Sequence, residues 1–367
     1  MNTMLQTKRV GATAMWMMPL LFLRTATALS SSSTVKPYGT AWIDYTAANE
    51  YLDEQYQDKI ANPYFPQTRK EETVYNGRNG VLVGLLPPPT TLSDSHDDND
   101  VSLVPPSLEA CGFCLSSLPV PDVKDWNNKA KLRECYLPIL RRHFQTEFGD
   151  NIRHLLFYNP MARGEALNAQ RQDLTSHELP TSPTQSKAHM DNDWNASDMN
   201  RVVGLVQKQS LDYYDKEEEF PEKKLRQDVQ DGYRYMVINC WRNIGATSIQ
   251  RAPLGVYATR YSQPLQCFPA QQPDFSTSHW YVFPQMTKDE CLLFKQFDRD
   301  NRYISDIWHC ALHSLTQQDT TADLRKSFDI RAFVVLNEKV PAKHDRYGNN
   351  RLEPRYKTAE EHQVATS

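Results

Sequence analysis

The segment FDIRAFVVL, residues 328–336, is a predicted strand and the starting point for the fold of this 367-residue chain. β-Branched and aromatic residues fill it, as is typical of strands with buried faces. Four more segments share this character and are separated by Gly, Pro, Asn and Asp: YRYMVINCW (233–241), LGVY (254–257), HWYVF (279–283) and CLLFKQF (291–297). Many short strands of this kind favour a barrel or a sandwich.

Helical support is expected on the N-terminal side of these strands. Residues 126–148 carry apolar side chains at three-to-four spacing, which predicts an amphipathic helix, and Gly149 suits its C-terminal end. Two further strands and a second helix are predicted at SLEACGFCL (107–115), IRHLLFY (152–158) and residues 200–214. We therefore expect one β domain over residues 107–340, built on a barrel with helices around it.

Composition excludes several classes of protein. Hydrophobic residues make up 40% of the chain, which is enough for a packed core and rules out full disorder. The net charge of −4 argues against nucleic acid as a partner. The seven cysteines are odd in number and scattered, unlike those of a small disulfide scaffold. Proline (23) outnumbers glycine (13), which fits short strands joined by turns.

The N-terminal residues follow the order of basic, apolar and small residues that is typical of a cleaved leader. Lys8 and Arg9 precede the apolar run 10–23, and small residues follow at Ala26 and Ala28. The run is short for a membrane span, so we expect none in the mature chain, although an uncleaved anchor is the alternative. Residues 1–28 then direct the protein to the secretory pathway or a plastid-type organelle; without a leader it would be cytoplasmic. The other expected parts are an N-terminal flank with a Pro-rich and acidic loop (29–106) and a polar tail (341–367).

The motif His189-Met190-Asp191 is the sharpest chemical feature. Alternate residues of a strand face the same side, so both outer side chains can reach one metal ion. A second histidine from a distant strand would complete two His and one carboxylate, the set typical of non-haem Fe(II) oxygenases. His309, in the apolar segment IWHCA, is the preferred candidate, with His313 in reserve and His279 as a third possibility.

Arg325 and Ser327 follow this region at i and i+2. On a strand they share one face, where a guanidinium and a hydroxyl can bind one carboxylate. The distal carboxylate of 2-oxoglutarate requires such a site. A structural ion pair on an edge strand is the alternative interpretation.

Seven blocks occur in a fixed order between residues 107 and 336: SLEACGF (107–113), YLPI (136–139), AHMD (188–191), INCWR (238–242), APLGV (252–256), WYVFPQMTKDE (280–290) and RKSFDIR (325–331). Together they resemble the CmcJ-like hydroxylase/desaturase family, which includes gibberellin-desaturase-like enzymes. The resemblance implies a double-stranded β-helix, or jelly roll, that uses Fe(II), 2-oxoglutarate and O₂. In that case His189, Asp191 and His309 would bind the iron.

The resemblance also implies roles for other residues. Arg325 with Ser327 would bind the cosubstrate carboxylate, with Arg331 as the competing anchor. The substrate pocket would be lined by Asn239, Trp241 and Arg242. The implied reaction is hydroxylation, desaturation or ring closure at an unactivated C–H bond of a small specialised metabolite. The alternative is a jelly-roll binding protein without metal or catalysis, and nothing in the sequence indicates an oligomeric state.

Overall fold

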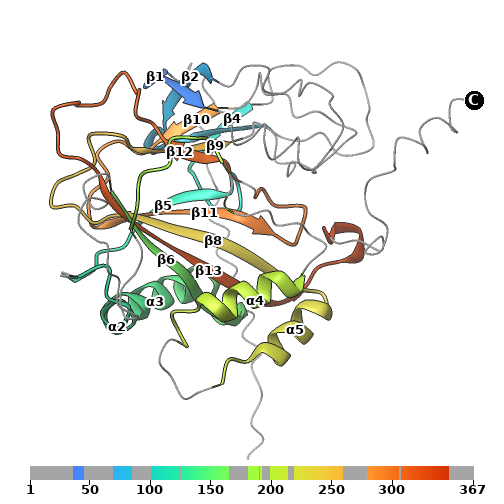
Figure 1. The fold of residues 1–367 in the computed structure, drawn as a ribbon. Coiled ribbons are helices and arrows are strands. Elements are labelled where there is room, and N and C mark those ends of the chain that lie inside the picture. Colours follow the sequence, from blue (N-terminus) through green and yellow to red (C-terminus); the bar gives the residue numbers. More distant parts are fainter. Residues whose placement is uncertain are drawn as a thin grey trace, which may run out of the picture.

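Two large β-sheets form the core of this protein (Figure 1). The computed structural model describes residues 36–44, 69–84, 101–121, 123, 125–164, 181–189, 191, 199–213, 219–258, 279–305 and 307–346. Within these residues the fold is mainly β with a few helices, and the predicted jelly-roll class is confirmed. None of the helices in this described part is long and apolar enough to span a bilayer.

The larger sheet has six strands. Their order is β5 (Phe113–Ser117), β11 (Glu290–Asp298), β8 (Tyr233–Asn243), β13 (Lys326–Lys339), β6 (Ile152–Gly164) and β7 (Thr181–Ser182). All neighbours are antiparallel except the short parallel pair β6 and β7. The five predicted strands at 107–115, 152–158, 233–241, 291–297 and 328–336 therefore belong to one sheet, although the first begins only at Phe113.

The smaller sheet has five strands and lies at the top of Figure 1. Their order is β1 (Gly39–Asp44), β2 (Arg69–Asn76), β10 (His279–Val282), β9 (Leu254–Ala258) and β12 (His309–Ala311). A separate hairpin-like pair joins β3 (Val81–Gly84) to β4 (Val101–Val104). The first two strands come from the expected flank of residues 29–106, so part of that flank is built into the sheet that carries His309.

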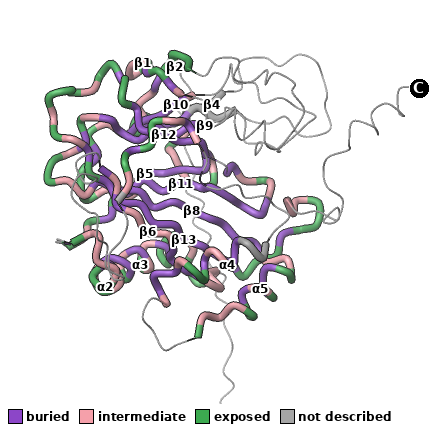
Figure 2. The backbone as a smooth tube through the Cα atoms, in the orientation of Figure 1, coloured by how far each residue is buried: buried purple, intermediate pink, exposed green. Residues whose placement is uncertain are grey.

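Alternation along β13 gives the larger sheet two different faces. Ile330 and Ala332 face a core that includes Leu140 of helix α3 (Leu137–Phe148). Phe333 and Val335 point the other way, toward α4 (Met199–Gln209) and α5 (Glu222–Gln230). Trp241 lies between the two sheets with Val256 and Tyr281. Figure 2 shows the consequence, a centre of buried strands with exposed residues gathered on the periphery.

The predicted helix over 126–148 is present but begins later and is irregular. It starts with α2 (Lys129–Lys131), where the Asn128 side chain accepts a hydrogen bond from Lys131 N, and passes through a π turn (Leu132–Tyr136) before α3. Pro138 has no N–H to donate at that junction, which favours a wider turn. Gly149 ends the helix with φ of 57°, as predicted.

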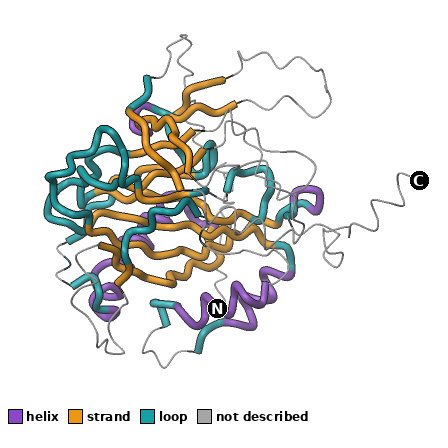
Figure 3. The backbone as a smooth tube through the Cα atoms, turned by 45° about the horizontal axis from the view of Figure 1, so that its top comes forward, coloured by secondary structure: helices purple, strands orange, loops and turns teal. Residues whose placement is uncertain are grey.

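The second predicted helix ends earlier than expected, at Gln209, and α5 was not predicted. Short 3₁₀ turns lie at Gly77–Asn79, Gly149–Asn151 and Ala342–His344. Helices and turns lie mostly around the strands, as the rotated view in Figure 3 shows.

The start of the expected tail is attached to the fold by the ion pair Arg299 Nη2–Asp345 Oδ2, at 2.7 Å. The expected leader of residues 1–28 and the rest of the tail from residue 347 lie outside the described residues. The proposed domain boundaries stay a prediction.

Candidate metal centre

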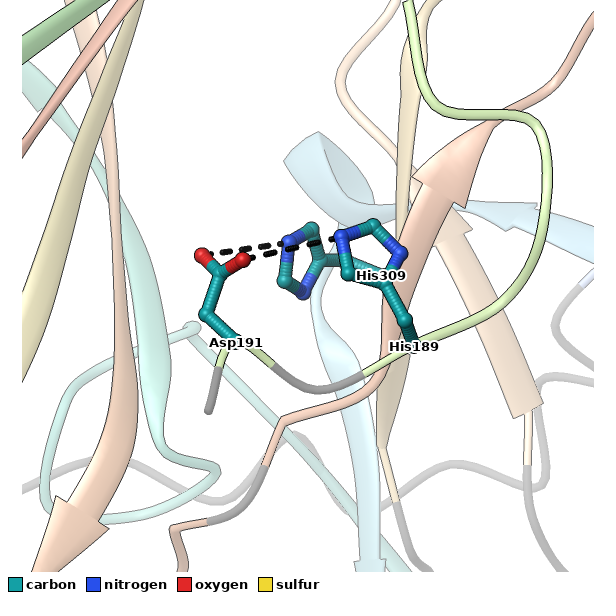
Figure 4. Close-up of side chains that lie close together, drawn as sticks. All are labelled: His189, Asp191 and His309. Carbon is teal, nitrogen blue, oxygen red and sulfur yellow. Dashed lines mark ion pairs between the residues drawn. The ribbon is translucent and has the colours of Figure 1, made fainter. Parts of the chain in front are cut away.

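His189, Asp191 and His309 come together between the two sheets. His309 begins β12, and its backbone pairs with that of His189: each N–H donates to the other residue's carbonyl, at 3.1 and 2.9 Å. Asp191 follows two residues after His189. The candidate ligand atoms of the three side chains all lie within 4.8 Å of one another. Figure 4 shows the Asp191 carboxylate facing both imidazoles, with each Nε2 at 3.6 Å from one oxygen.

Both imidazoles are oriented by backbone carbonyls behind them. Nδ1 of His189 lies 2.8 Å from Lys187 O, and Nδ1 of His309 lies 3.3 Å from Ile307 O. A carbonyl only accepts, so Nδ1 of each ring donates the proton and Nε2 is the nitrogen that faces the centre. Burial, reinforced by the neighbouring His189, lowers the pKa of His309 to about 3. His309 is therefore neutral near pH 7, the form that binds a metal ion.

Asp191 is buried but ionised. Burial alone would raise its pKa, yet the Arg331 guanidinium and the two histidines outweigh that effect and hold the pKa well below its usual range. Arg331 Nη2 lies 3.1 Å from Oδ1, and Asn239 Nδ2 donates a hydrogen bond to Oδ2. The backbone N–H of Asp191 donates to Gln296 Oε1 at 2.6 Å. These contacts fix the carboxylate in place and keep it negative, as a metal ligand must be.

A cavity adjoins the two histidines. Its other walls are Arg163, Gln185, Asn239, Trp241, Leu254, Phe294, Arg325 and Asp329. Arg325 Nη1 donates to Ala252 O at 2.5 Å, and its guanidinium carbon lies 5.2 Å from the centre of the Trp241 ring. Arg325 thus brings a positive charge to the same cavity as the histidines.

Three buried polar atoms, two of them from residues that line this cavity, test whether it suits a polar ligand. Ser327 Oγ, Asn239 Oδ1 and Trp241 Nε1 have no hydrogen-bond partner among the described residues. A buried polar atom without a partner costs free energy, so such atoms usually have a ligand or water. With the two-histidine, one-carboxylate donor set beside them, they fit an iron ion with a carboxylate cosubstrate.

The predicted pocket residue Arg242 lies elsewhere, which corrects that assignment. Adjacent residues of a strand face opposite sides, so Trp241 faces the cavity and Arg242 faces the helix side. Arg242 Nη2 donates to the carbonyls of Leu118 and Lys288, and the guanidinium stacks near the Trp126 and Tyr136 rings.

The other two histidines that the sequence offered as ligands are not part of the centre. His313 Nε2 lies 3.0 Å from Thr184 Oγ1 on an exposed stretch. His279 contacts the rings of Tyr75 and Tyr281. Arg331, the competing cosubstrate anchor, contacts Asp191 instead of the cavity wall.

Sequence reasoning missed three residues of the centre: Arg163, Gln296 and Asp329. Asp329 shares the strand face of Ser327 and Arg331, and this spacing was a usable signal. Arg163 forms an ion pair with Asp329 at 2.5 Å, but only the pairing of β6 with β13 brings them together. Gln296 lies at the bulge between Lys295 and Phe297, where strand alternation does not predict which way a side chain points.

Fold and ligands together define a jelly-roll protein with a two-histidine, one-carboxylate centre, and this class is that of non-haem iron enzymes. The chain belongs to the family whose model is described as "Oxidoreductase/YMDC permease-like domain", which matches residues 50–335. It is therefore an oxidoreductase. No curated protein matches the chain.

One solved structure supports the fold. The chain is similar to "iron and alpha-ketoglutarate-dependent endoperoxidase NvfI with different conformation", with 14% identity and a TM-score of 0.50, covering 82% of this chain and 98% of that one. A second structure of the endoperoxidase NvfI has 15% identity and a TM-score of 0.48, covering 81% and 97%. At these identities the likeness concerns the fold, and the ligand set described above is an independent observation on this chain.

Proposed function

We propose that this oxidoreductase is a non-haem Fe(II)/2-oxoglutarate-dependent oxygenase. The observation that carries the proposal is the convergence of His189, Asp191 and His309, whose ligand atoms lie within 4.8 Å of one another. Two imidazoles and one carboxylate leave several positions of an octahedral ion open, which suits an oxygenase better than a closed structural site. The fold shared with an enzyme named for iron and α-ketoglutarate agrees with this assignment.

The proposed cosubstrate site uses Arg325 and Ser327. Arg325 lines the cavity next to both histidines, and its charge suits a carboxylate. Ser327 is fully buried two residues further on. Arg325 lies directly before β13 and Ser327 lies within it. In this proposal one carboxylate accepts hydrogen bonds from the guanidinium and from the hydroxyl. Asn239 and Trp241 line the same cavity as Arg325 and the two histidines.

The substrate class is also a proposal. Iron with 2-oxoglutarate and O₂ supplies the oxidising power for breaking an unactivated C–H bond. The residues of this chain would hold the metal and orient the cosubstrate at a site whose walls include Trp241, Leu254 and Phe294. We propose a small specialised metabolite as substrate, with hydroxylation, desaturation or ring closure as the outcome. The CmcJ-like resemblance supports this choice.

Two features outside the centre complete the proposal. Residues 1–28 would be a targeting leader for the secretory pathway or a plastid-type organelle. No nucleic acid would be a partner, in keeping with the charge of −4.

An anaerobic titration tests the proposal directly. Metal-free protein receives Fe(II) and then 2-oxoglutarate, and a metal-to-ligand charge-transfer band in the visible spectrum is expected. The matched control is Asp191→Ala, which removes the charged ligand and should lose the band. If the wild-type protein gives no band and binds no metal, the chain is better described as a metal-free jelly-roll binding protein, the alternative function for this fold.

A further inference from the structure

Arg331 lies where it can compete with a metal ion for Asp191. It comes from β13, directly opposite Asn239 of β8 in the strand register. Its guanidinium Nη2 lies 3.1 Å from Asp191 Oδ1, on the side of the carboxylate that also faces His189. The Arg331 side chain is only 10% exposed. Arg331 therefore acts on the candidate metal ligand Asp191 through direct contact, and not only through a long-range electrostatic effect.

The surrounding charges make Asp191 the main counter-ion of Arg331. The other buried carboxylate nearby, Asp329, is paired with Arg163 at 2.5 Å, and these two charges offset each other. The Tyr158 hydroxyl is the remaining titratable group beside Arg331, and burial raises its pKa well above neutral, so it carries no charge. The pair of Arg331 with Asp191 is therefore close to neutral as a unit while the centre holds no metal.

A divalent ion that binds the Asp191 carboxylate would change these charges. The ion would offset the negative charge of Asp191, and the buried Arg331 guanidinium would then lie next to two further positive charges. Repulsion between charges at this range is substantial in a protein interior, and a buried charge without a partner is costly. A ligand with a carboxylate would reduce this excess of positive charge, because its negative charge attracts both the metal ion and the Arg331 guanidinium.

We propose that Arg331 makes metal binding at this centre depend on a carboxylate ligand, which we identify as the cosubstrate 2-oxoglutarate. Arg331 neutralises Asp191 and holds it in place while the triad is empty, and it opposes a metal ion that arrives alone. The metal ion and the cosubstrate then each increase the binding affinity of the protein for the other, and by thermodynamic linkage the two increases are equal. The inference rests on the proposed function, since it takes the triad as a metal site and 2-oxoglutarate as its ligand.

The opposite sign is expected if Arg331 serves only to position Asp191. Removing a positioning contact behind a metal ligand weakens metal binding. Removing an opposing charge strengthens it. The sign of the change in metal affinity therefore separates the two roles without any measurement of turnover.

The experiment is a calorimetric titration of metal-free, full-length protein with Co²⁺, with and without saturating 2-oxoglutarate. Arg331→Gln removes the charge and should bind Co²⁺ alone about tenfold more tightly than wild type. The factor by which 2-oxoglutarate improves Co²⁺ affinity should shrink by about the same amount, since the coupling is lost. Arg331→Lys keeps the charge and is the matched control, with affinity close to wild type. Equal or weaker Co²⁺ binding by Arg331→Gln overturns the inference.

Thermal unfolding gives a second readout that tolerates a destabilised variant. Without Arg331, metal-free Asp191 is buried with less compensation, so the Tm should fall, and Co²⁺ should raise the Tm by more than it does in wild type. The Arg331→Met variant, of similar length, serves if the glutamine variant does not fold. Equal shifts in wild type and variant count against the inference. His189→Ala separates the two hypotheses: wild-type Co²⁺ binding that survives this change defeats the proposed metal site itself.

Discussion

Asn239 and Asp191 form a buried hydrogen bond in which the amide Nδ2 donates to the carboxylate Oδ2. The register of β8 and β13 places Arg331 opposite Asn239, so each oxygen of Asp191 has its own donor. The carboxylate is thus oriented by two neighbouring strands of the larger sheet, whereas the histidines belong to the smaller sheet and the segment paired with it. The centre assembles only when both sheets are in place.

The first prediction concerns this amide. Asn239→Ala should weaken Co²⁺ binding about tenfold, because the donor that orients the carboxylate is lost. Cys240→Ala is the matched control, since the next residue faces the helix side and should leave metal affinity unchanged. Calorimetric titration measures both. Wild-type affinity in Asn239→Ala would show that Asp191 is held without the amide.

The second prediction separates the cosubstrate anchor from the metal site. Arg325→Ala should lower 2-oxoglutarate affinity about 10- to 100-fold, the loss expected for hydrogen bonds to a charged group. Binding of Co²⁺ alone should not weaken, because Arg325 touches none of the three ligands in the contacts described above. Lys326→Ala, at an exposed neighbour on β13, is the control. Quenching of tryptophan fluorescence by 2-oxoglutarate in the Co²⁺-loaded protein reports the affinity.

A third prediction follows from the neutral state of His309. Its pKa is lowered from 6.5 to about 3 by burial, so between these values the unfolded chain binds a proton that the folded protein does not. The free energy of unfolding must then fall as pH is lowered below 6.5. From pH 6.5 to 5 one such group contributes at most about 2 kcal/mol.

Urea unfolding in the presence of a chelator at pH 7 and pH 5 measures this loss for wild type and for His309→Gln. The variant should lose less stability over the same interval, because its side chain does not titrate. Since other histidines are present in both proteins, only the difference between them is informative. An identical loss in both would place the titrating group elsewhere.

The fourth prediction tests the reassignment of Arg242. Arg242→Met should lower the free energy of unfolding by about 2–4 kcal/mol, because two backbone carbonyls lose a buried charged donor. It should leave 2-oxoglutarate affinity unchanged. Trp241→Ala, on the cavity side, should reduce that affinity. A loss of cosubstrate binding in Arg242→Met would return this residue to the pocket.

Local patterns were enough for most of the strands, whereas the ligand set also depended on the resemblance to a known family. The strands around residues 233–241, 291–297 and 328–336 are buried on both faces, so their composition alone was a sufficient signal. His189 and Asp191 were expected on one strand; in the structure His189 forms an isolated bridge with His309 and Asp191 lies in a bend, yet both side chains face the same centre. His309 was preferred over His313 because its surroundings are apolar, and its burial in β12 agrees with that reasoning.

Long-range pairing explains what the sequence did not reveal. β2 runs parallel to β10, with Val74 opposite Trp280, and no local pattern indicates a partner so distant in the chain. Helix α5 is short and strongly charged, so its few buried residues, such as Leu225, gave a weak periodic signal. The misplacement of Arg242 came from treating INCWR as one motif, although strand alternation divides its residues between two faces.

The row Ser327, Asp329, Arg331 along β13 has a consequence for how this centre can change over time. The residues between them, Phe328 and Ile330, belong to the hydrophobic core on the opposite face. Inserting or deleting one residue within the strand would exchange the two rows, burying charges against helix α3 and presenting phenylalanine to the metal. Substitutions can therefore change the chemistry of the site gradually, whereas a change in the length of β13 would disrupt the site and the hydrophobic core together.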